Sequence, residues 1–280
     1  MLPRWNTSLN NINLFINALD EVLSGIEIES NKRGRPPKHD RKDYLKLIII
    51  KEWKKRSLRA AETDYSELVC GKRVDHSVIH YEEKVLGKEL IERVIMLIGQ
   101  RLDVKIGYEF SVIDATKFTT WKNRTVEYHL LTRIAKETVY PASVFFGSVN
   151  PSRATGETLI EGNDDLLGDA WYDDNLAIKT MFQHGYNPII KPNQNRSGGY
   201  WRRKARKLYS HPTGKQKYRQ RGRGESPFGS LTVEFGDRLK TIRNDTTIVR
   251  IGCRIIAYQL KIYVRNNIFY IVIMLFGVNY

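Results

Sequence analysis

The chain has 280 residues, of which 41% are apolar, enough for one large or two ordinary domains; this excludes a disordered chain and a disulfide-stapled miniprotein. Lysine and arginine number 46 against 31 aspartates and glutamates, and the net charge of +15 points to a polyanion, nucleic acid first. The two cysteines, Cys70 and Cys253, have no metal-ligand spacing, which fits a reducing compartment. The apolar run at 268–278 is shorter than the roughly 20 residues of a membrane-spanning helix, so we expect no membrane association.

Residues 1–40 are predicted to form an amphipathic helix and a basic linker. Apolar residues recur at helical spacing over 12–23. The segment 31–38 contains two prolines, a glycine and four cations, a composition that prevents regular structure. Its Arg-Gly-Arg-Pro core is also that of an AT-hook, in which Arg33 and Arg35 would enter an A·T-rich minor groove. A plain linker is the equal alternative, because so short a motif often occurs by chance.

Residues 41–104 are predicted to form a small helical domain that resembles a helix-turn-helix. Ser57 and Asp75 are typical N-caps, and they predict helices that begin just after them, joined by a turn. Basic and polar side chains crowd this turn and the start of the second helix, where a recognition helix meets the groove of DNA. We expect DNA contacts from Lys72, Arg73 and His76. The alternative is a helical bundle without a role in DNA binding.

Residues 105–265 are predicted to form an α/β domain with a mixed sheet. Segments with strand-like patterns lie at 108–114, 126–134, 139–146, 166–169 and 186–191, with helices between the last three. This order is that of the ribonuclease-H-like fold, in which the first and fourth strands are adjacent and parallel. The C-terminal ends of these two strands would therefore bring Asp114 and Asp169 together at one edge of the sheet.

Three acidic residues stand in contexts that resemble those of the DDE transposases encoded by bacterial and archaeal insertion sequences. Asp114 lies in Val-Ile-Asp-Ala-Thr, Asp169 opens Asp-x-x-Tyr-Asp, and 218–225 reads Tyr-x-x-Arg-x-x-x-Glu. The resemblance covers roughly residues 33–265. The lysine that this family carries seven residues beyond the glutamate is Thr232 here, so that part of the signature is missing.

The resemblance implies a transposase that binds the terminal inverted repeats of its insertion sequence, cleaves DNA and transfers strands. Asp114, Asp169 and Glu225 would be its catalytic carboxylates and would hold two Mg²⁺ ions, for which Mn²⁺ could substitute. Carboxylates suit these hard cations, and paired ions activate and stabilise phosphodiester oxygens. Asp173 is expected to N-cap the following helix instead. The implied partners are double-stranded DNA, as terminal repeats and as target, and a second copy of the chain, in a prokaryotic cytoplasm and associated with the nucleoid.

The segment 196–224 carries eleven cations and no acidic residue. A run of charge is usually a solvated face, but this one precedes Glu225 and includes aromatic residues that can stack on bases. We therefore expect a loop that grips DNA, through Arg202, Arg203, Lys204, Arg206 and Lys207. The resemblance adds Tyr218 and Arg221 as contacts to phosphates near the cleaved end.

Three other classes of protein also act on DNA. None of the six histidines has an arginine three positions later, which disfavours a phage-type tyrosine recombinase. A sequence-specific DNA-binding protein derived from a transposase would bind the terminal repeats without cutting them. A structure-specific nuclease of the same fold would cut DNA without joining the released end to a target. The sequence leaves open the role of the apolar tail at 266–280.

Overall fold

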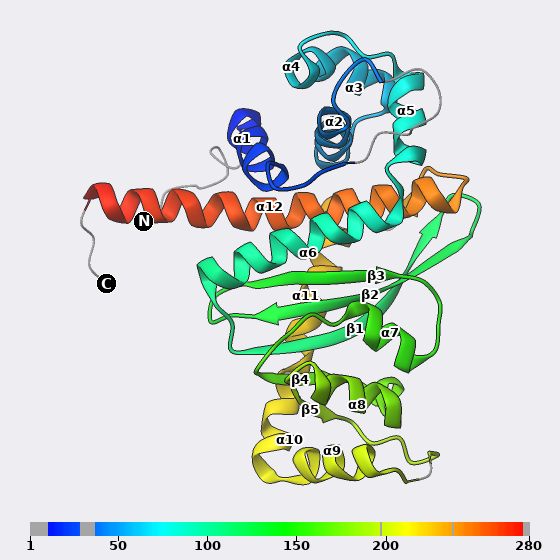
Figure 1. The fold of residues 1–280 in the computed structure, drawn as a ribbon, viewed down its shortest axis with the longest axis vertical. Helices are drawn as coiled ribbons and strands as arrows, with labels where there is room; N and C mark the ends of the chain where they lie inside the picture. Colours follow the sequence, from blue (N-terminus) through cyan, green and yellow to red (C-terminus); the bar gives the residue numbers. More distant parts are fainter. Residues whose placement is uncertain (1–10, 29–36, 197, 237, 277–280) are drawn as a thin grey trace. The chain divides into compact units, whose positions relative to one another are not determined.

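The computed structural model describes residues 11–28, 37–196, 198–236 and 238–276, with side chains to residue 266. The chain divides into two compact units, coloured along the sequence in Figure 1. One comprises Met1–Ile98 with Arg243–Tyr280, and the other Gly99–Ile242. The expected AT-hook residues, Arg33 and Arg35, lie outside the described residues.

The first unit is helical. Its helices are α1 (Ile12–Leu23), α2 (Arg41–Trp53), α3 (Leu58–Asp64), α4 (Ser66–Cys70), α5 (His76–Val85), the first part of α6 (Gly87–Ile106), and α12 (Asn244–Phe276). The predicted N-caps are confirmed, since the side chain of Ser57 accepts from the Ala60 N–H and that of Asp75 from the Ser77 N–H. Helix α12 packs on α1, α2 and α5, so residues from 243 onward belong with the N-terminal helices rather than with the sheet.

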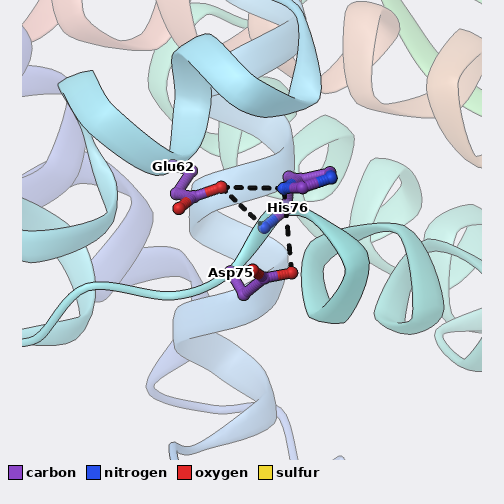
Figure 2. Close-up of side chains that lie close together, drawn as sticks. All are labelled: Glu62, Asp75 and His76. Atoms are coloured by element: carbon purple, nitrogen blue, oxygen red, sulfur yellow. Dashed lines mark hydrogen bonds and ion pairs between the residues drawn. The ribbon is translucent and has the colours of Figure 1, made fainter.

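Glu62 of α3 fixes the turn between α4 and α5 (Figure 2). Its carboxylate accepts from the Arg73 guanidinium at 2.8 Å and from the His76 backbone N–H at 3.0 Å, and it lies 2.9 Å from His76 Nδ1. Possible ligand atoms of Glu62, Asp75 and His76 lie within 4.8 Å of one another. Because Glu62 and Asp75 already accept the hydrogen bonds that cap α5 and close the turn, we assign this cluster a structural role.

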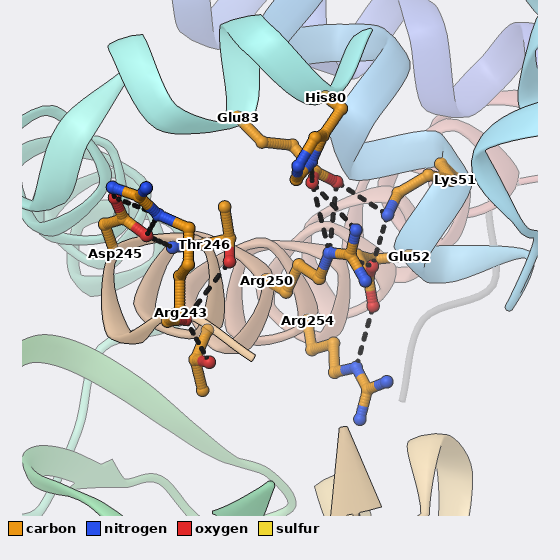
Figure 3. Close-up of polar contacts among 10 residues, drawn as sticks. Lys51, Glu52, His80, Glu83, Arg243, Asp245, Thr246, Arg250 and Arg254 are labelled. Atoms are coloured by element: carbon orange, nitrogen blue, oxygen red, sulfur yellow. Dashed lines mark hydrogen bonds and ion pairs between the residues drawn. The ribbon is translucent and has the colours of Figure 1, made fainter. Parts of the chain in front are cut away.

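A buried ionic network joins α2, α5 and α12 (Figure 3). Lys51 Nζ lies 2.7 Å from a carboxylate oxygen of Glu52 and 2.7 Å from one of Glu83. Arg250 bonds Glu83 at 2.8 Å, and Arg254 bonds Glu52 at 2.9 Å. Burial alone raises the pKa of both glutamates, but the surrounding cations outweigh it and hold each pKa below its usual value. The network explains how α2 can be buried on nearly every side although it contains charged residues.

The second unit contains a mixed sheet. Its strands are β1 (Phe110–Thr120), β2 (Thr125–Ile134), β3 (Val139–Phe146), β4 (Asp165–Gly168), β5 (Asn187–Ile190) and β6 (Arg238–Leu239). The order is β3-β2-β1-β4-β5, with β6 paired to the far end of β1. Strands β1, β2 and β3 are antiparallel neighbours, whereas β4 is parallel to both β1 and β5. The predicted mixed sheet with adjacent, parallel first and fourth strands is confirmed.

Helices cover this sheet, and its strands alternate between two cores. The elements are α7 (Pro151–Thr158), α8 (Asn175–Gln183), α9 (Tyr200–Ser210), α10 (Pro212–Tyr218) and α11 (Ser226–Phe235), with 3-10 helices η1 (Ala170–Tyr172) and η2 (Arg219–Glu225). Ile113 packs with Ile178 of α8, whereas its neighbour Val112 packs with Tyr209 and Tyr218. Side chains of a strand point alternately to its two faces, so Asp114 lies on the face of Val112.

Two sequence expectations differ from the structure. Strand β1 does not end at Asp114 but continues to Thr120, because its last residues pair with β2 and β6. The expected loop at 196–224 is mostly helical, since Ala205 gives the basic helix α9 a buried face. Within the described part of the chain, no helix has the length and apolarity needed to cross a membrane; the apolar tail continues α12 as far as Phe276.

Candidate active site

Asp114 and Asp169 are neighbours because of the parallel pairing of β1 and β4. Ile113 pairs with Gly168, so the residues that follow them adjoin at the same edge. Both aspartates line a cavity of about 180 Å³. Burial raises the pKa of Asp114, and the negative charge of Asp169 adds to this effect, although the Arg221 guanidinium opposes it. The pair therefore has the electrostatics of a site that binds cations.

Glu225 reaches the same place from the end of η2. Gly224 lies so close to β1 that a Cβ atom there would be 2.4 Å from Val112 Cγ1, which only glycine allows. Arg221 then links two of the carboxylates, with one nitrogen 2.7 Å from Asp114 Oδ2 and another 2.8 Å from Glu225 Oε1. All three predicted carboxylates therefore lie around β1, although residues 114 and 225 are 111 positions apart in the sequence.

Tyr218 lies beside this group. It packs against the sheet in the Val112 core, and its ring meets that of Tyr209 edge-on at 5.1 Å. Burial raises its pKa, so the hydroxyl stays protonated and can donate a hydrogen bond. Thr232, where the family has lysine, is exposed on α11, and its hydroxyl donates to the Phe228 carbonyl.

The turn that carries Asp169 is anchored by residues that the sequence analysis missed. Asp169 caps η1 by accepting from the Trp171 N–H at 2.9 Å. Within η1, the Tyr172 hydroxyl lies 2.9 Å from His129 Nδ1, and the Trp171 ring stacks on His129 at 5.4 Å. Burial lowers the pKa of His129 and keeps its ring neutral. The available signal was a histidine between the apolar residues Tyr128 and Leu130 of strand β2.

Glu127, which the sequence analysis did not single out, lines the same cavity as Asp114 and Asp169. It lines the cavity from β2, beside Trp171 and Tyr172. Its oxygens accept from the Ser148 hydroxyl at 3.1 Å and lie 3.7 Å from His129 Nε2. Its contribution is to add negative charge to the wall of the cavity.

Asp173 and Arg202 have different roles from those expected. Asp174, not Asp173, caps α8, because its side chain accepts from the N–H groups of Leu176 and Ala177. Asp173 instead holds Arg202 through two hydrogen bonds of 2.9 and 2.6 Å. Both residues are buried, with 2% and 3% of their surfaces exposed. The expectation that Arg202 contacts DNA is therefore wrong. Arg202 is a structural residue that attaches α9 to the segment after η1.

The other expected DNA contacts differ in their environment. Arg203 and Lys207 are exposed on α9, as is Lys204, whose ammonium lies 4.1 Å from the centroid of the Phe182 ring. Arg206 is partly buried against the Asn193 carbonyl. In the helical unit, Lys72 and Arg73 are exposed, and His76 is partly buried against Glu62.

Comparison with known proteins gives one result. The family model described as "Transposase DDE domain" matches residues 105–260, more than half of the chain. No curated protein and no solved structure matches significantly. The match covers the sheet, both aspartates and the segment that ends at Glu225. With its mixed sheet in the order described above, the chain belongs to the DDE transposase family and has that family's ribonuclease-H-like domain.

Proposed function

We propose that the protein is an active transposase that binds the terminal inverted repeats of an insertion sequence, cleaves the DNA there and transfers the cut strands. The observation that carries the proposal is the convergence of Asp114, Asp169 and Glu225, with Arg221 bonded to the first and the last of them. The role of Arg221 and Tyr218 is to hold a phosphate of the cut end beside the carboxylates.

Two Mg²⁺ ions, or Mn²⁺, fit this group of side chains. Three carboxylates are hard oxygen ligands, and Asp114 is central because it adjoins Asp169 and shares Arg221 with Glu225. The guanidinium of Arg221 places positive charge between Asp114 and Glu225, as a bound metal ion would. When bound, the ions would activate the attacking oxygen and stabilise the leaving oxygen.

DNA binding is divided between the two units in this proposal. The exposed cations of α9, Arg203, Lys204 and Lys207, contact phosphates and give affinity without sequence preference. Lys72 and Arg73, in the turn before α5, and His76, its first residue, contact base edges and give sequence preference. A second copy of the chain would bind the other end of the element, since the two terminal repeats are equivalent.

The test is cleavage of end DNA in Mg²⁺ by Asp114→Asn, Asp169→Asn and Glu225→Gln. Each change keeps the size of the side chain and removes its charge, so cleavage should fall by orders of magnitude while binding of the terminal repeat persists. Glu157→Gln is the matched control, because Glu157 is exposed on α7 and paired only weakly with Arg153, at 3.9 Å. A variant of the three that cuts at the parental rate would show that its residue is not a catalytic carboxylate.

The same assay separates the rival functions. A parental protein that binds the repeats and never cuts them is a DNA-binding protein derived from a transposase. One that cuts branched DNA and never joins the released end to a target is a structure-specific nuclease. Strand transfer is therefore scored on a second, supercoiled DNA in the same reaction.

A further inference from the structure

Beyond Asp114, β1 and β2 continue as a two-stranded hairpin with an exposed tryptophan at its tip. Trp121 has 66% of its surface exposed, which is unusual for so large an aromatic side chain. The backbone of Trp121 is nevertheless held in place, because its N–H donates to the Leu239 carbonyl at 2.9 Å. The turn closes with a hydrogen bond from the Asn123 N–H to the Thr120 carbonyl, also 2.9 Å long. The indole ring is therefore presented to solvent by an ordered turn.

Exposed cations lie along the hairpin and on β6, which pairs with the last residues of β1. We define the hairpin surface as Lys117, Trp121, Lys122, Arg124, Arg238 and Lys240. The stretches that contribute it, 115–126 and 238–243, contain no acidic residue. The Lys240 ammonium lies 5.3 Å from the centroid of the Trp121 ring, within the range of a cation–π contact. The Lys117 ammonium forms an ion pair with Glu127 of the neighbouring strand, with 3.6 Å between Nζ and Oε2.

This combination of groups matches the chemistry of an unpaired nucleotide. An aromatic face stacks on a base, and cations beside it contact the flanking phosphates. Paired bases inside a duplex are already stacked and cannot reach such a ring, whereas a base that has left the helix can. A surface that bound only duplex phosphates would need the cations alone.

The hairpin extends from the strand that carries Asp114. Asp114 and Thr120 belong to the same strand and are six residues apart, so the tip of the hairpin begins at most about 20 Å from Asp114. That length corresponds to about six nucleotide steps of B-form DNA. The strand that supplies a catalytic carboxylate would thus also hold DNA a short way from the cut.

We propose that the hairpin surface binds unpaired nucleotides of the DNA next to the cleavage site, with Trp121 stacked on a base and Lys122, Arg124 and Lys240 against phosphates. The assignment of the nucleic acid as element DNA rests on the proposed function. The placement of the ring and the cations does not depend on it.

The experiment compares two synthetic probes, a fully paired duplex and the same duplex with a short run of unpaired thymidines. Trp121→Ala should weaken binding of the unpaired probe by about 5- to 150-fold, the effect of losing one stacked base, and change binding of the paired probe by less than about twofold. Trp121→Phe keeps an aromatic face and should retain most of the affinity for the unpaired probe. Leu176→Ala, which shortens another exposed apolar side chain on α8, should alter neither.

The cations are tested in parallel. Lys122→Gln with Arg124→Gln should weaken both probes and reduce the salt dependence of binding, whereas Arg153→Gln on α7 should leave it unchanged. Circular dichroism checks that each variant is folded. The inference is overturned if Trp121→Ala weakens both probes equally or neither, or if Trp121→Phe loses as much affinity as Trp121→Ala.

Cleavage of end DNA by the parental protein is measured alongside. A parent that binds the unpaired probe through Trp121 but cuts no DNA in Mg²⁺ contradicts the proposed function and supports the inference. A parent that cuts, with Trp121→Ala binding both probes as the parent does, contradicts the inference alone.

Discussion

The hydroxyl of Tyr172 and Nδ1 of His129 are 2.9 Å apart, and this contact connects β2 to the turn that begins at Asp169. Burial raises the pKa of Tyr172 and lowers that of His129, so a neutral phenol and a neutral ring share this hydrogen bond. The position of one catalytic candidate thus depends on a histidine 40 residues earlier, at 129 against 169.

The first prediction concerns this contact. His129→Leu leaves the buried Tyr172 hydroxyl without its hydrogen-bond partner and should cost about 1–3 kcal/mol of stability. His129→Asn keeps a polar amide that can accept or donate near the position of Nδ1 and should retain more of the stability. If the contact positions Asp169, Mg²⁺ should raise the melting temperature of His129→Leu less than that of the parent. An equal increase in both proteins would assign His129 to stability only.

The second prediction concerns the close approach of η2 to β1. Gly224→Ala places a methyl group against Val112, so η2 must move away and carry Glu225 with it. Cleavage should fall by at least about tenfold, since displacements near 1 Å are costly at catalytic centres. Gly222→Ala is the matched control in the same 3-10 helix, because a Cβ there meets nothing within 4 Å. Equal cleavage by the two variants would mean that the position of Glu225 does not depend on this contact.

A third prediction separates two adjacent arginines of α9. Arg202→Gln breaks a buried ion pair with Asp173 and should lower the free energy of unfolding by about 3–5 kcal/mol. Arg203→Gln, at an exposed position, should change stability by less than about 0.5 kcal/mol but reduce the slope of log affinity against log salt by about 0.9. Urea titrations and DNA binding at several salt concentrations measure both. The reverse result would place Arg202 rather than Arg203 on the DNA.

The fourth prediction concerns pH and the ionic network of Figure 3. The pKa of Glu52 and of Glu83 is lower in the folded protein than in the unfolded chain, so the unfolded chain binds protons first as pH falls. The stability from both groups is therefore complete above the unfolded pKa of about 4.3 and is lost below it. Replacement of both Glu52 and Glu83 by Gln should reduce the fall of the melting temperature as the pH decreases. Glu157→Gln should not change this fall. A parental melting temperature that is constant down to pH 3, about one unit below that value, would contradict the prediction.

Local patterns in the sequence were sufficient for most elements of the fold. Helical spacing and N-caps such as Ser57 and Asp75 depend on residues a few positions apart, and strand alternation depends on near neighbours. The order of strands then implied the parallel pairing that brings Asp114 to Asp169, because few topologies satisfy that order. The expectation for Glu225 came from a spaced motif, and the structure places it at the same edge through Arg221.

Tertiary structure alone decided features that depend on distant segments. Whether Arg202 is a DNA contact or a buried partner of Asp173 depends on how α9 packs, and nothing in the charge of 196–224 distinguishes the two. The length of β1, which ends at residue 120, depends on pairing with β6, which begins at residue 238, more than a hundred residues later in the chain. Likewise, His129 acquires its role only when η1 folds against β2. Local propensity favours a conformation for a segment, but the final extent of the element and the burial and partners of its side chains are set by the segments packed against it.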